Sequence, residues 1–274
     1  MKAALTLITA LAYVAACLLY LHFFVTRKEA AERWGFGVLW VGFIAHTAGL
    51  VINYWNMGRF PVIDLRESLC FFSWSMAGMY LAVRTIRSAA PLGTFVLPVI
   101  AGVFIAAALL KKAALPPNDM FATILFPLHI LLIFSGYAAF TLAFGSGIMY
   151  LLQERGLKSR RPGRVLDRLP SLSELDGLIY LSLGIGFPLL TLGIITGAAW
   201  LHNLEGVYIK WNPEINASMV TWLLYAVILH ARLLAGWRGR KMAAASVLGF
   251  ALILFTFLGA GLVSSGFHGF FNYP

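Results

Sequence analysis

The chain has 274 residues, of which 60% are hydrophobic and 12% are charged, and its mean hydropathy is +0.82. This composition excludes an ordinary soluble domain and is typical of a multispanning membrane protein. The formal net charge is +10. The basic residues stand in short segments between apolar runs and not on a soluble face, so we predict contact with membrane lipid and no nucleic-acid partner.

Eight segments approach the roughly 20 apolar residues that a membrane span needs. The first begins like a signal peptide, but its apolar run continues past Cys17, so we expect an uncleaved span. Cys17 and Cys70 stand in separate runs without a CxxC motif, which favours packing over redox chemistry. Because no long soluble segment interrupts the spans, we predict one integral-membrane domain over residues 1–274. The spans are expected at about residues 4–26, 34–54, 68–86, 92–110, 121–151, 177–200, 218–235 and 243–265.

The basic residues divide unevenly between the two sides of these spans. The connections after spans one, three, five and seven hold 15 of the 21 Lys and Arg residues, and the opposite side holds 6. Cytoplasmic connections carry the excess of positive charge in membrane proteins. The sequence therefore predicts an all-α, polytopic bundle of about eight transmembrane helices, with the N-terminus and the C-terminus both outside.

Four histidines fall at two predicted depths. His46 and His230 each lie twelve residues into a span, which places them roughly 18 Å from the entry face and near the midplane. His129 and His268 lie toward the outer face. Two pairs at two depths would suit bis-histidine ligation of haem iron. The alternative is that these histidines pack and form hydrogen bonds between helices.

Aromatic and small residues surround the outer connection after span six. Trp200, Tyr208 and Trp211 could stack on a flat macrocycle, although Trp and Tyr also form the belt at any membrane interface. On span six, Gly193 and Gly197 form a small-xxx-small pattern that lets another backbone approach closely. We expect this pattern to serve packing within the bundle rather than dimerisation.

Several motifs, in order and spacing, resemble the cytochrome c assembly family, specifically its CcsA (ResC) and HemX branch. The resemblance covers most of the chain. It rests on Gly58-Arg59-Phe60-Pro61 with Glu67-Ser68, Leu128-His129, Tyr150 to Arg155, Leu169-Pro170-Ser171-Leu172 with Leu175-Asp176, Gly186 to Gly193, Leu229-His230-Ala231-Arg232, Gly236-Trp237-Arg238-Gly239, Gly249-Phe250 and Gly266-Phe267-His268.

The resemblance implies roles for the histidines. The positions of His129 and His268 match outer haem ligands that flank a Trp-rich loop, and that of His230 matches a ligand within the membrane. His46 is a weaker match, because in larger members the partner ligand lies elsewhere in the assembly. The implied cofactor is haem b, held by neutral imidazoles. Candidates to meet its propionates are Arg59, Arg66 and Lys210.

The outer loop departs from the family pattern. Trp200, Gly206, Tyr208, Trp211 and Pro213 match, whereas the other signature residues are replaced by Glu205, Ile209, Asn212, Glu214, Ile215 and Ala217. The location that the resemblance implies is the inner (plasma) membrane of a bacterium. The implied function is a haem-binding protein of cytochrome c biogenesis that handles or exports haem and presents it at the outer face, with an apocytochrome c and a CcsB/ResB-like membrane subunit as partners. The sequence contains no motif for an acid, a base or a nucleophile. Whether the chain is a component of a cytochrome c haem lyase is therefore left open. The alternative is a HemX-like, non-catalytic membrane regulator or scaffold linked to tetrapyrrole synthesis.

Overall fold

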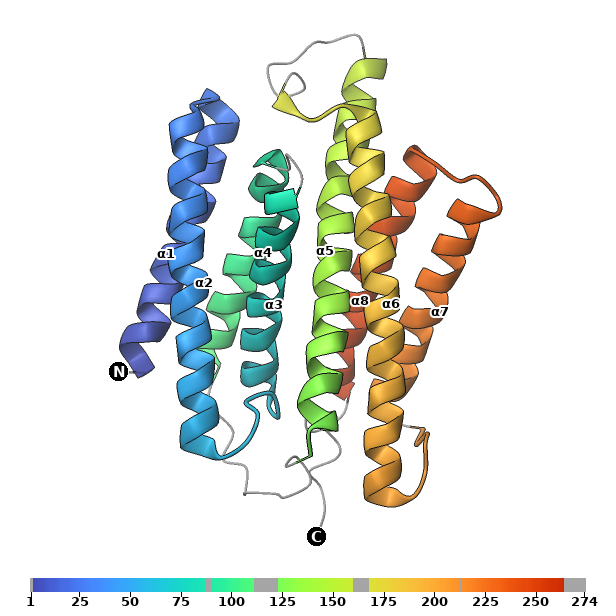
Figure 1. Cartoon of the computed structure of the whole chain (residues 1–274). Coiled ribbons are helices and arrows are strands. Elements are labelled where there is room, and N and C mark those ends of the chain that lie inside the picture. The colour runs from blue at the N-terminus through green and yellow to red at the C-terminus, as the bar shows by residue number, and fades with distance from the viewer. Residues whose placement is uncertain (1, 87–89, 111–122, 160–167, 212, 264–274) are drawn as a thin grey trace.

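The structure is a computed structural model that describes residues 2–86, 90–110, 123–159, 168–211 and 213–263. It confirms the predicted all-α membrane fold, because the described residues form eight long helices and no strand (Figure 1). Six of these, α1 to α6, are long and apolar enough to cross a membrane. The helices are α1 (Lys2–Thr26), α2 (Glu29–Met57), α3 (Leu65–Ile86), α4 (Ala90–Leu109), α5 (Leu125–Lys158), α6 (Leu172–Glu205), α7 (Pro213–Leu233) and α8 (Arg240–Val263).

Consecutive helices run in opposite directions, so their connections alternate between the two ends of the bundle (Figure 1). The connections rich in Lys and Arg follow α1, α3, α5 and α7 and share one end, which we call the basic end. The start of α1, the α2–α3 connection and the α6–α7 connection share the other end. We call that end the outer end, since the distribution of positive charge predicts that it faces away from the cytoplasm.

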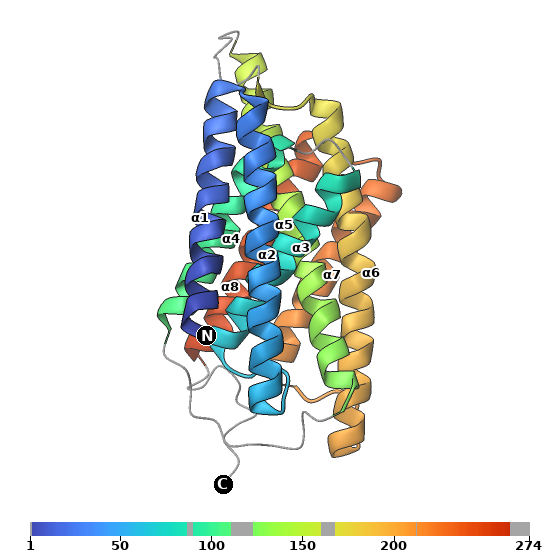
Figure 2. The ribbon, with the colours of Figure 1, turned by 60° about the vertical axis from the view of Figure 1, so that its left-hand side comes forward.

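The eight helices form two groups of four (Figures 1 and 2). In the first group α1 packs against α2 and α4, and α3 packs against α2 and α4. In the second group α5 packs against α6 and α8, and α7 packs against the same two helices. Contacts of α5 with α3 and α4 join the groups. A residue of α2 and a residue of α7 therefore belong to different groups, whatever their depth.

Glycines on α5 and α6 allow these two helices to approach closely. A Cβ atom at Gly136 would lie 3.1 Å from the carbonyl oxygen of Gly186, and one at Gly193 would lie 2.7 Å from the Ile133 side chain. A Cβ atom at Gly197 would lie 2.6 Å from the ring of His129 on α5. The expectation that Gly193 and Gly197 serve packing inside the bundle is thus confirmed.

Partly buried ion pairs explain several of the sequence motifs. At the outer end, Arg59 donates to both carboxylate oxygens of Glu67, at 2.9 and 3.3 Å. At the basic end, Arg232 binds Asp176 at 2.7 and 3.0 Å, and the backbone N–H of Gly239 donates to the same carboxylate at 2.7 Å. Asp176 therefore fastens the α7–α8 connection to the start of α6.

Candidate functional site

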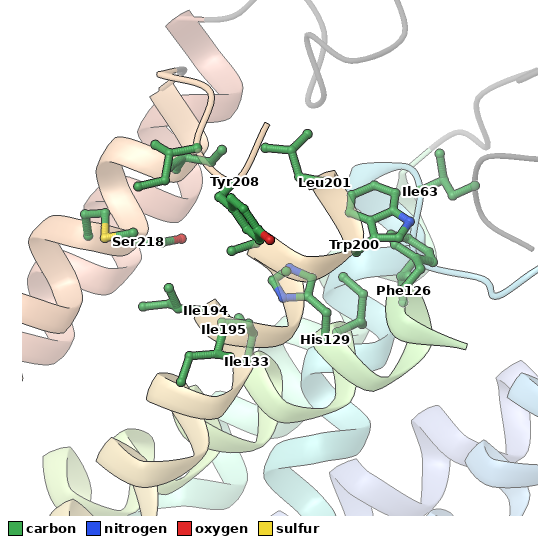
Figure 3. A pocket seen from close by; sticks show the side chains of 17 residues that line it. Ile63, Phe126, His129, Ile133, Ile194, Ile195, Trp200, Leu201, Tyr208 and Ser218 are labelled. Atoms are coloured by element: carbon green, nitrogen blue, oxygen red, sulfur yellow. The ribbon is translucent and has the colours of Figure 1, made fainter. Parts of the chain in front are cut away.

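A largely apolar cavity of about 380 Å³ lies at the outer end of the second helix group. Its walls come from α5, α6 and α7, and its cover comes from the α2–α3 and α6–α7 connections. Figure 3 shows the imidazole of His129 in the middle of this space, with Tyr208 across from it and Trp200 and Phe126 to one side. The lining residues are Val62, Ile63, Phe126, His129, Ile130, Ile133, Ile194, Ile195, Gly197, Ala198, Trp200, Leu201, Tyr208, Ile209, Ile215, Ser218 and Met219.

His129 is held in one tautomer by the backbone of α6. Its Nδ1 lies 2.7 Å from the carbonyl oxygen of Gly193. A carbonyl oxygen can only accept a hydrogen bond, so Nδ1 carries the proton and Nε2 keeps its lone pair. Nε2 forms no hydrogen bond within the described residues. The absence of a side chain at Gly197 makes room for the ring. The arrangement leaves one neutral nitrogen available as a metal ligand.

Aromatic rings form one side of the cavity. Trp200, only 8% exposed, packs on Phe126 with ring centroids 5.0 Å apart. Tyr208 lies parallel to the ring of His202, with centroids 4.1 Å apart and an interplanar angle of 2°. Flat faces and apolar walls suit a large planar ligand. Trp222 is engaged elsewhere, since its Nε1 donates to Thr191 Oγ1 at 3.0 Å.

An ion pair crosses the altered part of the loop. Lys210 Nζ lies 2.9 Å from a carboxylate oxygen of Glu205. Between these residues, Gly206 ends α6 with φ of 73°, a left-handed conformation that glycine adopts without strain. Ile209 lines the cavity from the same loop. The loop therefore keeps an apolar contact with the cavity although Glu205 and Ile209 replace Trp residues of the resembled pattern.

Three of the predicted site residues meet at this cavity: His129, Trp200 and Tyr208. Trp211 does not line it and is 76% exposed. His268 lies outside the described residues. The proposed propionate partners do not line it either. Arg59 is paired with Glu67, Lys210 is paired with Glu205, and Arg66 lines a different cavity.

The structure does not bring His46 and His230 together. His46 is buried in the first helix group, with Nδ1 3.1 Å from Tyr13 Oη and Nε2 3.2 Å from Cys70 Sγ. His230 lies exposed in the last turn of α7, near the basic end. The prediction that both lie near the midplane was wrong, because α7 begins at Pro213 instead of residue 218 and ends soon after His230.

Sequence reasoning missed how α6 positions His129. Gly193 and Gly197 entered only as a packing pattern, yet one provides the carbonyl acceptor and the other the space for the imidazole. A spacing of four residues on one helix face was the available signal. Phe126 and Ser218 also line the cavity without having been predicted, because single apolar or hydroxyl residues in a span carry no distinguishing pattern.

The chain resembles known proteins over most of its length. A family model described as "Cytochrome C assembly protein" matches residues 62–268. The cytochrome c biogenesis protein CcsA of Chlamydomonas reinhardtii is 33% identical over 242 residues, which are 81% of this chain and 65% of that protein. CcsA of Parasynechococcus marenigrum (strain WH8102) is 31% identical over 252 residues, 82% of each chain.

A solved structure shares the fold. The chain titled "Cytochrome c Heme Lyase CcmF" superposes with a TM-score of 0.68 and 19% sequence identity, over 99% of this chain and 49% of that one. This chain thus spans about half of the CcmF chain and slightly less than two thirds of the algal CcsA. Since the family model covers well over half of its residues, this chain is a multi-pass membrane protein of the cytochrome c assembly family.

Proposed function

We propose that this protein of cytochrome c biogenesis binds haem b in the cavity at the outer end, where His129 Nε2 would bind the iron. The observation that carries the proposal is the hydrogen bond from His129 Nδ1 to Gly193, which fixes the neutral tautomer with its lone pair on Nε2. The apolar lining and the rings of Trp200 and Tyr208 fit a planar macrocycle. The residues present thus fit the group that the family implies.

The side chains of the cavity can bind and orient but offer little acid–base chemistry. Among the described residues, the lining contains no carboxylate, lysine or arginine. When bound, haem would supply vinyl groups for thioether bonds to cysteine thiols. The chain would contribute the imidazole of His129, aromatic faces that set the plane of the ligand, and apolar walls that exclude water. In this proposal His268 would provide a second imidazole for the iron.

The wider roles belong to the same proposal. The protein would lie in a bacterial inner membrane, receive haem from a CcsB/ResB-like subunit and present it to an apocytochrome c. The names of the relatives support cytochrome c biogenesis, and the outer position of the cavity suits delivery on that side. His46 and His230 have no part in this proposal, because they lie in different helix groups.

A HemX-like membrane regulator remains the second candidate. The Glu205–Lys210 ion pair favours it, since Glu205 replaces a Trp of the family's loop pattern and is held by Lys210. Such a protein would bind haem without attaching it. Haem binding and cytochrome c maturation therefore have to be measured separately.

The test compares His129→Ala with His230→Ala, which removes an exposed imidazole far from the cavity. We expect His129→Ala to lose most of its haem after purification, to regain part of it with added imidazole, and to be expressed normally. His230→Ala should keep wild-type haem. Equal haem content in the two variants would refute the ligand assignment. Haem-stained cytochrome c in a strain that lacks its own assembly protein then distinguishes presentation from regulation.

A further inference from the structure

A second cavity lies at the outer end of the first helix group. Its volume is about 310 Å³, and helices α1 to α4 all contribute to its walls. It shares no lining residue with the cavity of His129. The lining residues are Leu5, Thr6, Thr9, Ala45, His46, Gly49, Leu50, Asn53, Met57, Pro61, Arg66, Glu67, Cys70, Phe104, Ala107 and Ala108.

Most polar groups of this cavity already have partners inside the protein. Both ring nitrogens of His46 are engaged, one by Tyr13 and the other by Cys70. The hydroxyl of Thr9 donates to the carbonyl oxygen of Leu5 at 2.8 Å. Glu67 accepts from Arg59 and from the backbone N–H of Ile63. These groups therefore need no hydrogen-bond partner from a ligand. The apolar part of a ligand can lie against them without leaving a buried polar atom unpaired.

Two polar side chains differ from the rest. Arg66 on α3 and Asn53 on α2 line the cavity, are only half-buried, and form no hydrogen bond or ion pair within the described residues. The nearby carboxylate of Glu67 is already occupied by Arg59, at 2.9 Å. Within the part of the chain that the structure describes, Arg66 is therefore a guanidinium without an ion-pair partner at a cavity whose other polar groups are mostly engaged. A guanidinium in this position favours a carboxylate or a phosphate as its partner.

We propose that this cavity binds a single-chain amphiphile with an anionic headgroup. Its carboxylate or phosphate would pair with Arg66 and accept a hydrogen bond from the Asn53 amide. Its hydrocarbon tail would lie along Leu50, Met57 and Phe104, toward the floor formed by His46 and Cys70. A cavity of this volume accommodates one chain of moderate length rather than a two-chain lipid. The outer end of the bundle lies where such molecules meet the membrane surface.

The experiment uses the full-length protein in nanodiscs of phosphatidylcholine, with a diazirine-bearing palmitate as the probe. Photocrosslinking is quantified by mass spectrometry of the intact protein, and the labelled peptide is then identified. We expect saturable labelling on α1 to α4. Because one charge-assisted interaction is lost, Arg66→Ala should weaken the apparent affinity by about 10- to 100-fold. Arg33→Ala is the matched control, since it removes an exposed guanidinium at the basic end.

A second variant tests the location without touching the charge. Ala108 lines the cavity and is exposed, so Ala108→Phe narrows the space at little cost to folding. This variant should also reduce labelling. Unchanged labelling in either Arg66→Ala or Ala108→Phe would overturn the proposal. His129→Ala should lose haem and keep palmitate labelling, so the failure of one site is distinguishable from the failure of the other.

Competition identifies the source of the headgroup. Unlabelled palmitate as the stronger competitor would indicate a free fatty acid, and lysophosphatidylglycerol as the stronger competitor would indicate a phosphate headgroup of lipid. Either result supports an anionic amphiphile. Hexadecanol has a similar tail and no charge. If hexadecanol competes as well as palmitate does, the role assigned to Arg66 is wrong.

Discussion

Replacement of Gly197 by Ala tests how α6 positions the proposed ligand His129. A Cβ atom at this position would lie 2.6 Å from both Cε1 and Nδ1 of the imidazole. Non-bonded carbon atoms separate to about 3.5–4.0 Å, so the ring has to move by roughly 1 Å. The Nδ1 hydrogen bond to Gly193 is 2.7 Å long and does not survive such a shift with good geometry. Loss of this hydrogen bond costs about 0.5–1.5 kcal/mol. Without it, the proton is no longer fixed on Nδ1, and Nε2 is no longer held as the nitrogen with the lone pair.

Gly184 on the same helix provides the control. A Cβ atom there meets nothing within 4 Å, and the residue is exposed. Gly184→Ala should keep full haem and gain roughly 0.5–1 kcal/mol of stability from the better helix propensity of alanine. Gly197→Ala should retain at most about a tenth of wild-type haem, a loss of roughly 1.4 kcal/mol or more. The measurement is the reduced haem spectrum per mole of purified protein. Equal haem in the two variants would refute this account of His129.

Three further outcomes are expected. Tyr208→Ala should weaken haem binding up to about tenfold in haem titrations, because stacking on an aromatic ring contributes about 0.5–1.5 kcal/mol. Trp211 lies outside the cavity, so Trp211→Ala should leave the titration unchanged. Asp176→Asn should lower the free energy of unfolding by about 1–3 kcal/mol, because it weakens the hydrogen bonds that Arg232 and Gly239 donate. Thermal unfolding in detergent measures this change. An unchanged midpoint would show that the ion pair does not stabilise the bundle. Cysteines placed at Lys158 and at Lys210 should be labelled from opposite sides of the membrane, since Lys158 ends α5 at the basic end and Lys210 follows α6 at the outer end. Labelling of both from one side would contradict the orientation.

The sequence alone determined the helices and their order. A span in lipid has to satisfy every backbone N–H and C=O group within itself, so each apolar run of sufficient length becomes a helix. The alternation of basic and non-basic connections then predicts which end of the bundle faces the cytoplasm, because the positions of Lys and Arg can be read from the sequence. Even the close approach of some neighbouring helix to α6 could be anticipated from Gly193 and Gly197. None of these features depends on which helix becomes the neighbour of which.

The depth of each histidine was predicted less well than the helices themselves. The start of α7 at Pro213 moved His230 into the last turn, where its ring is exposed. Polar residues such as Asn216 and Ser218 hide this start from a hydropathy argument, although they continue the helix. The depth of a residue along the membrane normal also says nothing about its lateral position in the bundle. His46 and His230 would have remained apart even at equal depth, because α2 and α7 pack into different groups of four helices.

Only the tertiary structure decided which residues share a cavity. Helix packing turned His129 toward α6 and brought Trp200 and Tyr208 beside it, whereas the loop left Trp211 facing outward. Packing also paired Arg59 with Glu67, whereas Arg66 lines a separate cavity and has no ion-pair partner among the described residues. The physical reason is that the rotation of each helix about its axis depends on contacts among all its neighbours. The spacing of residues along one chain does not contain those contacts.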